Sequence, residues 1–531
     1  MPLNHAMYVF GTRACSLLAV VVALRLWRAS DAPGLASALA MWALWTLLRA
    51  PRRRLVGELA VALSIALVET ACAMEGRAAY GDLYLAMGAL ALCIPLVLAP
   101  QGRSALPMNG LDRYFVCQDY EGMRVNSHHF VDVSEQPSRE ALHDAVEALL
   151  AEMPIARSFV HQAVLGMERF VASRPWVGAG ELVQWLEKTI EADYEVLDAP
   201  IDLAERPPWR VIVAPRREGG WRIVLTIHHS AADGTGGMLW LSRLLKRYEE
   251  SRTGKPPGRL PADPPARRFR ELFRPQGTAW LLRMVRRHVR PMDKVGVRNA
   301  SLLDDEAPRL SESAHALCEV PDAEWARLKA RAEELGVSRN DLLVTASLRA
   351  ADGWRRARQR PDQRFRILLP TDLRPALDLP PSFQNFVGVV RSDFSAEEVR
   401  AEGLPRLVSE RVKLGRTLDE AIETPVNLGF LSAVLPPGLF RLLLRNFDND
   451  PRSFFFSYLF SQVRIPSDLP RPPGTERVWV RGSLPRQPGF GIVVCPDGER
   501  VTVAFEYLEA YVSEASVADY RDRFLAEISR A

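Results

Sequence analysis

Residues 228–234 read His228-His229-Ser230-Ala231-Ala232-Asp233-Gly234, and the rest of the chain is organised around this stretch. A short apolar run, residues 223–227, precedes it, and an amphipathic segment, residues 238–250, follows it. This order predicts a strand, a tight loop and a helix, with two histidines where the loop begins. The unperturbed pKa of histidine lies nearest neutrality, so a neutral imidazole here can take a proton at physiological pH.

The acidic residue and the glycine of the stretch predict a loop that is held from within. The Asp233 carboxylate can fix the loop through an ion pair, and Gly234 can turn where a Cβ would clash. A structural interpretation is also open, because Asp-Gly is a common turn signal and paired histidines often have no chemistry. A second pair, His128-His129, lacks the Asp-Gly spacing, and we interpret it as structural.

Several motifs, taken together, resemble one enzyme family. The His-His-x-x-x-Asp-Gly stretch resembles the signature of acyltransferases related to chloramphenicol acetyltransferase and to peptide-synthetase condensation domains. Pro207-Pro208-Trp209 is similar to the Pro-Leu-Trp block of bacterial wax ester synthase/diacylglycerol acyltransferases, with Pro208 in place of leucine. Residues 108–112 resemble the Leu-x-x-x-Asp start of these enzymes.

The second half of the chain continues the resemblance, which extends from about residue 107 to the C-terminus. Asn340-Asp341 resembles the Asn-Asp block, although Ser338 and Asp341 also form a helix-capping arrangement, so we assign them to structure. Residues 369–374 and 385–388 resemble the Pro-x-x-x-Arg and Gly-Asn segments, with Gln384 in place of the glycine before Asn385. The resemblance implies an α/β fold of two chloramphenicol-acetyltransferase-like lobes with an active-site tunnel between them.

The composition excludes some classes of protein. A chain of 531 residues suggests two or three domains, and a net charge of +4 gives no nucleic-acid footprint. The six cysteines show no Cys-x-x-Cys and no metal-ligand spacing, which fits a reducing compartment without a disulfide framework.

Residues 1–105 form a separate region with four apolar runs, at 7–24, 32–48, 55–74 and 83–99. Each run approaches the length of about 20 residues that spans a bilayer as a helix. Arginines at 49 and 52–54 place the central loop in the cytoplasm, so we expect about four spans with the catalytic region cytoplasmic. Arg13, Glu58 and Glu69 lie inside the runs. They favour an ion pair between helices, or interfacial helices, over a polar path for a lipid headgroup.

The remaining chain divides into two lobes and a connection. We expect an N-terminal lobe at 106–265, a basic crossover at 266–311 and a C-terminal lobe at 312–531. Arginines interleave with apolar residues from Trp280 to Arg290, which predicts an amphipathic helix. That helix could lie on an anionic membrane or form an ordinary solvated face, and both interpretations stay open.

The resemblance also implies a chemistry. His229 is the expected general base, while His228, Asp233 and Gly234 support the loop. Ser230, the Gly234 backbone and Asn385 are candidates for binding an oxyanion, and Asn385 or Arg374 for fixing the loop. Arg374 is one candidate partner for Asp233, and a residue of the first half is an equal alternative. No metal and no bound cofactor are expected, and acyl-CoA would be a co-substrate.

Three functions remain open at this stage. The first is a membrane-bound acyltransferase that moves an acyl group from acyl-CoA to the hydroxyl of a lipophilic acceptor, in the wax ester or acylglycerol manner. The second keeps the fold but takes the acyl group from a carrier protein, or transfers it to an amine. The third, of another class, is a catalytically silent, membrane-anchored protein that binds lipid or acyl groups. The expected partners are the acyl donor, the alcohol and the bilayer.

Overall fold

The computed structural model of the chain describes residues 105–119, 125–161, 169–172, 178–190, 195–260, 280, 299–304, 313–423, 425–426, 428, 440–442, 444–445, 456–484 and 488–530. The four apolar runs and most of the basic crossover therefore lie outside the described residues. Within these ranges, no helix combines the length and the apolar character needed to cross a bilayer. Residues Leu106–His161, Arg169–Gly429 and Arg441–Ala531 form one compact unit.

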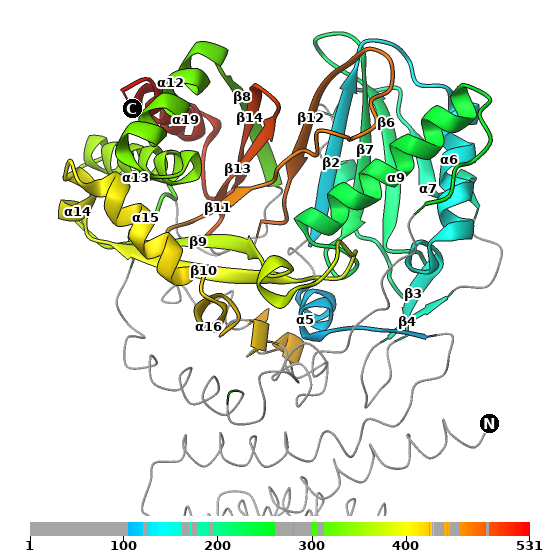
Figure 1. Ribbon diagram of the computed structural model, residues 1–531, viewed down its shortest axis with the longest axis horizontal. Helices are drawn as coiled ribbons and strands as arrows, with labels where there is room; N and C mark the ends of the chain where they lie inside the picture. Colours follow the sequence, from blue (N-terminus) through cyan, green and yellow to red (C-terminus); the bar gives the residue numbers. More distant parts are fainter. Residues whose placement is uncertain are drawn as a thin grey trace, which may run out of the picture. The chain divides into compact units, whose positions relative to one another are not determined.

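The first half of this unit is built on a five-stranded sheet with the strand order β12-β2-β7-β6-β5. Helices α6 and α9 pack against each other across one face of this sheet (Figure 1). Strands β6 and β7 form the hairpin that leads into the His228–Asp233 loop, and α9 leaves that loop. The strands are β2 (Asn126–Val133), β5 (Val183–Trp185), β6 (Trp209–Pro215), β7 (Trp221–His228) and β12 (Thr475–Arg481), and the helices are α6 (Arg139–Glu152) and α9 (Gly234–Arg252).

The second half is built on a six-stranded mixed sheet with the order β10-β9-β11-β13-β14-β8. Helices α12, α13 and α19 lie together on this sheet, and α15 packs against α13 (Figure 1). The strands are β8 (Ser313–Val320), β9 (Phe365–Asp372), β10 (Val387–Phe394), β11 (Tyr458–Gln462), β13 (Phe490–Asp497) and β14 (Arg500–Leu508). The main helices are α12 (Asp322–Leu335), α13 (Arg339–Ala357), α15 (Leu404–Gly415) and α19 (Glu514–Arg530).

Shorter elements complete the unit. A small sheet has the order β1-β4-β3, and helix α5 follows β1 directly. These elements are β1 (Ala105–Pro107), α5 (Gly110–Gln118), the 3-10 helix η2 (Pro154–Arg157), β3 (Ser158–His161), β4 (Arg169–Ala172), α7 (Ala179–Leu182), α8 (Glu195–Asp198), the 3-10 helix η6 (Pro375–Leu377), α14 (Ala396–Arg400) and α16 (Leu418–Ala421).

Strand β12 joins the two halves, because it comes late in the chain yet pairs with β2 of the first sheet. Phe130 of β2 lies opposite Trp479 of β12, and their rings stack with centroids 3.7 Å apart. Both side chains are fully buried. Beside them, the buried carboxylate of Asp132 accepts hydrogen bonds from Arg222 of β7 and Arg477 of β12. The first sheet is therefore completed only by a segment of the second half.

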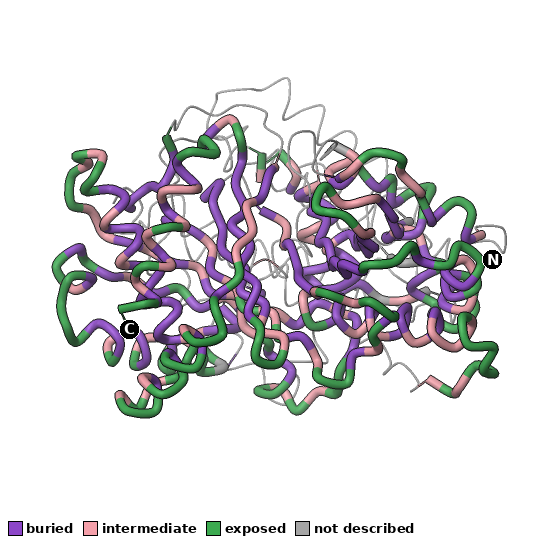
Figure 2. Tube along the Cα trace, turned by 90° about the horizontal axis from the view of Figure 1, so that it is seen from above, coloured by how far each residue is buried: buried purple, intermediate pink, exposed green. Residues whose placement is uncertain are grey.

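The buried residues form two main apolar cores, one under each large sheet. Figure 2 shows them as buried stretches of the trace inside exposed turns and helix faces. The core of the first sheet also takes in residues of the second half, among them Val478, Val480 and Cys495. This fits the α/β, two-lobed architecture expected from the sequence, although the exchange of β12 was not predicted.

The stacked pair offers a test of the strand exchange. Trp479→Ala should lower the free energy of unfolding by about 3–5 kcal/mol, because it empties a fully buried aromatic site. Trp479→Phe, which keeps a ring against Phe130, should lower it by less than half of that amount. Chemical denaturation followed by circular dichroism measures both values. An alanine variant that unfolds at the wild-type denaturant concentration would rule out this packing.

Candidate active site

The backbone of the histidine loop is fixed at its start by the residues that precede β2 and β6. The N–H of His228 donates to the carbonyl of Pro208, and the N–H of His229 donates to that of Val125. Within the loop, the N–H of Ala231 donates to the carbonyl of His228. The predicted strand, loop and helix are therefore present, with His228 ending β7 and Asp233 capping α9.

The Asp233 carboxylate is buried and accepts hydrogen bonds on both oxygens. Oδ1 accepts from the N–H of Gly236 at 2.8 Å, which caps α9. Oδ2 accepts from the N–H of Phe386 at 2.8 Å. The two terminal nitrogens of Arg374 lie 3.1 and 3.0 Å from Oδ1 and Oδ2. Asp233 thus binds the second half of the chain, and the partner is Arg374 rather than a residue of the first half.

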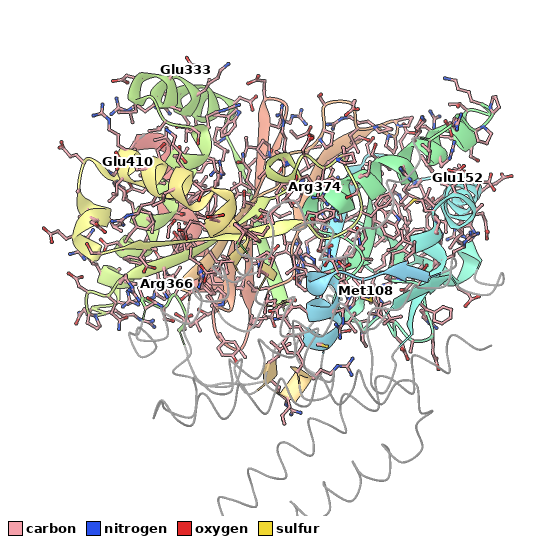
Figure 3. All side chains as sticks on the ribbon, turned by 60° about the horizontal axis from the view of Figure 1, so that its bottom comes forward. Met108, Glu152, Glu333, Arg366, Arg374 and Glu410 are labelled. Carbon is pink, nitrogen blue, oxygen red and sulfur yellow. The ribbon has the colours of Figure 1, made fainter. Side chains whose placement is uncertain are left out.

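Arg374 is buried and collects acceptors from the connection between β9 and β10. It donates to Asp372 Oδ1 at 2.9 Å and to the carbonyls of Ser382 and Gln384 at 3.0 and 2.6 Å. Figure 3 labels Arg374 where α9 meets this connection. Because one guanidinium binds all these groups, it fixes the segment that carries Asn385. Gln384 stands where the resembling enzymes have glycine. The hydrogen bond from Arg374 does not depend on this side chain, because it is accepted by the backbone carbonyl of residue 384.

Asn385 determines which ring nitrogen of His229 carries the proton. Its Nδ2 lies 2.7 Å from the His229 carbonyl and 2.8 Å from Asp112 Oδ1, and both of these groups accept. The amide nitrogen must therefore face them, so the amide oxygen faces His229 Nδ1, at 3.0 Å. An oxygen cannot donate there, so Nδ1 carries the hydrogen. The lone pair of the neutral ring lies on Nε2.

His228 takes the opposite tautomer. The N–H of Ser230 donates to His228 Nδ1 at 3.1 Å, so that nitrogen accepts and the ring proton lies on Nε2. Nε2 faces Asp119 Oδ2 at 3.3 Å, and the Ser230 hydroxyl lies 2.8 Å from Nδ1. His228 is fully buried, whereas His229 is half-buried. His228 therefore supports the loop, as expected. Ser230 takes part in this support, because both its N–H and its hydroxyl contact His228 Nδ1.

Helix α5 and its C-terminal cap contact the histidine loop at two points and Asn385 at a third. Asp112 holds Asn385, Phe115 stacks on the His229 ring with centroids 3.8 Å apart, and Asp119 faces His228. The helix is in turn held by Asn109, whose side-chain nitrogen donates to the Asn385 carbonyl at 2.8 Å. In the sequence, this region is marked only as the start of the resemblance. The Asn109–Asp112 capping spacing was visible in the sequence, whereas nothing marked Phe115 or Asp119.

Burial shifts the pKa of two groups in the site. It lowers the pKa of His229 below its ordinary value, so Nε2 is unprotonated near neutral pH. Burial also raises the pKa of Asp112 to about 7, although hydrogen bonds from Asn385 and Asn109 act in the other direction. Buried carboxyl groups whose pKa is shifted in this way are common in functional sites.

The other histidine pair lies within the first sheet. His128 is buried with Nδ1 3.1 Å from Thr226 Oγ1, and burial lowers the pKa of His129 to about 3. The His129 ring packs against α9, because a Cβ built on Gly237 would lie 2.1 Å from its Nε2. This placement fits the structural interpretation of the pair.

The glycine that makes close contact is not the one expected. A Cβ on Gly234 would meet only Val463, at an ordinary 3.5 Å, and its φ is not positive. A Cβ on Gly236 would lie 2.6 Å from the Phe383 carbonyl, and Gly237 is tighter still. The expectation that Gly234 avoids a clash is therefore wrong. A residue without a Cβ is required instead at Gly236 and Gly237, where α9 packs closely against Phe383 and His129.

The contacts also narrow the candidates for an oxyanion donor. Both amide hydrogens of Asn385 are used, by Asp112 and by the His229 carbonyl, so Asn385 fixes the site rather than donating to substrate. The Ser230 hydroxyl is engaged with His228. The backbone amide of Gly234, in the first turn of α9, is the candidate that these contacts leave.

Comparisons with known proteins show the fold. No protein-family model and no curated protein matches the chain. Polyketide synthase associated protein 5 from Mycobacterium tuberculosis is 19% identical with a TM-score of 0.55, covering 81% of this chain and 99% of that one. The first condensation domain of the CDA synthetase is 15% identical with a TM-score of 0.58, covering 81% and 96%. The epimerization domain from the third module of tyrocidine synthetase B is 13% identical with a TM-score of 0.57, covering 81% and 99%. The described chain therefore has the two-lobed α/β fold of these domains.

The two glycines can be compared directly in variants. Gly237→Ala should lower the free energy of unfolding by about 1–3 kcal/mol, because the new methyl group meets the buried His129 ring. Gly234→Ala should be neutral or stabilising by up to about 1 kcal/mol, since alanine favours the helix and the space is open. Thermal and chemical unfolding of both variants measures the difference. Equal destabilisation by the two changes would contradict this placement.

The pKa of His229 can be read from its ring. The neutral form is favoured by burial, so protonation should require a pH below the ordinary midpoint of 6.5. NMR titration of ¹⁵N-histidine-labelled protein, assigned by loss of the signal in His229→Ala, gives the midpoint. A His229 midpoint above 6.5 would show that the ring is stabilised as a cation and is not poised to accept a proton.

Proposed function

We propose that the chain is an acyltransferase in which His229 is the general base. The observation that carries the proposal is the contact between His229 Nδ1–H and Asn385 Oδ1, which leaves the Nε2 lone pair without a hydrogen-bond partner among the described residues. A lowered pKa keeps that lone pair available at neutral pH. Because the ring is stacked on Phe115, it also holds one orientation. A proton acceptor fixed in this way suits attack by a hydroxyl or an amine.

The reaction is a direct transfer. The O–H bond of the acceptor breaks as Nε2 takes the proton, and the oxygen forms a bond to the thioester carbonyl carbon. The tetrahedral oxyanion then collapses, the C–S bond breaks, and Nε2–H returns the proton to the leaving thiolate. Donors near the oxyanion lower this barrier, and the Gly234 amide is our candidate. No acyl-enzyme is needed.

The substrates follow from the sequence rather than from the site. The motifs resemble wax ester synthase/diacylglycerol acyltransferases, and the four apolar runs suit a lipophilic acceptor. We therefore propose acyl-CoA as donor, a fatty alcohol or acylglycerol as acceptor, and a membrane-bound enzyme whose catalytic lobes face the cytoplasm. Pro208 and Gln384 are the positions at which the chain departs from the motifs of these enzymes.

A second candidate keeps the mechanism and changes the donor. Structures similar to this chain include a polyketide synthase associated protein and domains of peptide synthetases. These names favour an acyl group delivered as a thioester on a carrier protein, or an amine acceptor. A silent binding protein is less well supported, because His229, Asp233 and Gly234 are all present and the contacts around His229 suit a base.

Thiol release tests the proposal. Full-length protein in detergent is given long-chain acyl-CoA with fatty alcohols, diacylglycerol or amines, and then acyl carrier protein as donor. Acceptor-dependent release should fall by about 10²–10⁴-fold in His229→Ala, because the general base is lost. His143→Ala, a histidine on α6 outside the site, is the matched control and should keep wild-type activity.

The outcomes separate the candidates. Release that persists in His229→Ala would overturn the mechanism. Release only from the carrier protein would select the second donor, and release only with amines would select amide formation. Binding of acyl-CoA without release under any condition would point to the silent protein.

A further inference from the structure

We propose that Asp112 is a positioning residue for His229, acting through Asn385 to fix the imidazole tautomer that leaves Nε2 free. This inference rests on the proposed role of His229 for its effect on activity. The placement of the ring proton can be tested without any substrate.

Three side chains form a continuous hydrogen-bonded chain across the site. Asp112 Oδ1 accepts from Asn385 Nδ2 at 2.8 Å, and Asn385 Oδ1 accepts from His229 Nδ1 at 3.0 Å. Asp112 and Asn385 are each 1% exposed, so water does not compete for these groups. Asp112 lies on α5, Asn385 on the β9–β10 connection and His229 after β7. The chain therefore joins three separate elements.

Asn385 depends on Asp112 because the two ends of an amide have nearly the same shape. A half-turn about the last side-chain bond exchanges oxygen and nitrogen. After such a turn, nitrogen would face His229 Nδ1, and the proton of the neutral ring would move to Nε2. Only acceptors beside the nitrogen prevent this. There are two in the described site, the His229 carbonyl and Asp112 Oδ1. Above its pKa of about 7, Asp112 is a carboxylate and the stronger acceptor of the two.

Helix capping alone does not account for this aspartate. Asp112 Oδ2 accepts from the Asn109 N–H at 2.7 Å and completes a capping box on α5. Asp341 does the same on α13, where it accepts from the Ser338 N–H at 2.9 Å. Both carboxylates are buried, at 1% and 3% exposed. Of these two aspartates, only Asp112 uses its second oxygen to hold a side chain that contacts His229. Variants of the two therefore distinguish an effect on helix capping from an effect on the position of His229.

The experiment compares Asp112→Asn with Asp341→Asn in the full-length protein. An asparagine at 112 has one acceptor for two N–H donors, so either the cap or Asn385 loses its partner. We expect kcat for acceptor-dependent thiol release to fall by about 10–100-fold, the effect of leaving one buried hydrogen-bond donor without its acceptor. The KM for acyl-CoA should change by less than about twofold, because the described side-chain contacts of Asp112 are with Asn385 and the cap of its own helix. Asp341→Asn should lower the melting temperature but keep kcat within about twofold.

A double variant shows whether Asp112 acts through Asn385. Asn385→Ala should itself lower kcat, and adding Asp112→Asn should then lower it by no more than about twofold, because residues in one chain are not additive. Independent losses that multiply would overturn the proposal. An Asp112→Asn enzyme with the kcat of Asp341→Asn would overturn it as well.

The position of the proton on the His229 ring can be measured without an activity assay. In ¹⁵N-histidine spectra at neutral pH, wild-type His229 should show a protonated Nδ1 and a bare Nε2. Asp112→Asn should mix the two tautomers, whereas Asp341→Asn should not. An unchanged tautomer in Asp112→Asn would overturn the positioning role. If the wild-type protein releases no thiol with any acceptor, the proposed function fails, and the spectra still decide the role of Asp112.

Discussion

The ion pair between Asp233 and Arg374 is the interaction on which the rest of the site depends. Both side chains are buried, and a buried pair is stable only when its remaining donors and acceptors are also satisfied. Here the carboxylate also accepts from the N–H groups of Gly236 and Phe386, and the guanidinium donates to Asp372 and two carbonyls. Removing one partner of such a pair typically costs about 3–5 kcal/mol. The pair therefore sets the relative position of the two halves at the loop.

The same pair explains how an acidic residue that does not touch His229 can still govern it. Asp233 binds the backbone of Phe386, and Arg374 binds the carbonyl of Gln384. Asn385 lies between these two anchored residues, and its side chain reaches both His229 and Asp112. The orientation of the imidazole thus depends on groups from the opposite half and from α5. Such support is what a base needs to hold one geometry.

Local signals predicted much of this. Elements that depend on neighbouring residues could be predicted from the sequence. These are the strand before His228, the helix after Asp233 and the capping box of α13. Asp233 and Arg374 were named, but only the fold could decide between the possible partners. Phe115 and Asp119 were missed, because their contacts join segments about 110 residues apart that carry no shared pattern. The close-contact glycines were misplaced for the same reason, since the clashes come from Phe383 and from His129 of β2, both distant in sequence.

The late arrival of β12 has a consequence for synthesis of the chain on the ribosome. Until residue 481 has emerged, β2 lacks one of its two neighbours and presents an open edge. All eight residues of β2 are buried in the finished protein, whereas an open edge leaves backbone N–H and C=O groups unpaired and able to pair with another chain. The contact from Asp132 to Arg477 spans 345 residues, which delays closure of the sheet. The first sheet can therefore be completed only when most of the chain has been synthesised.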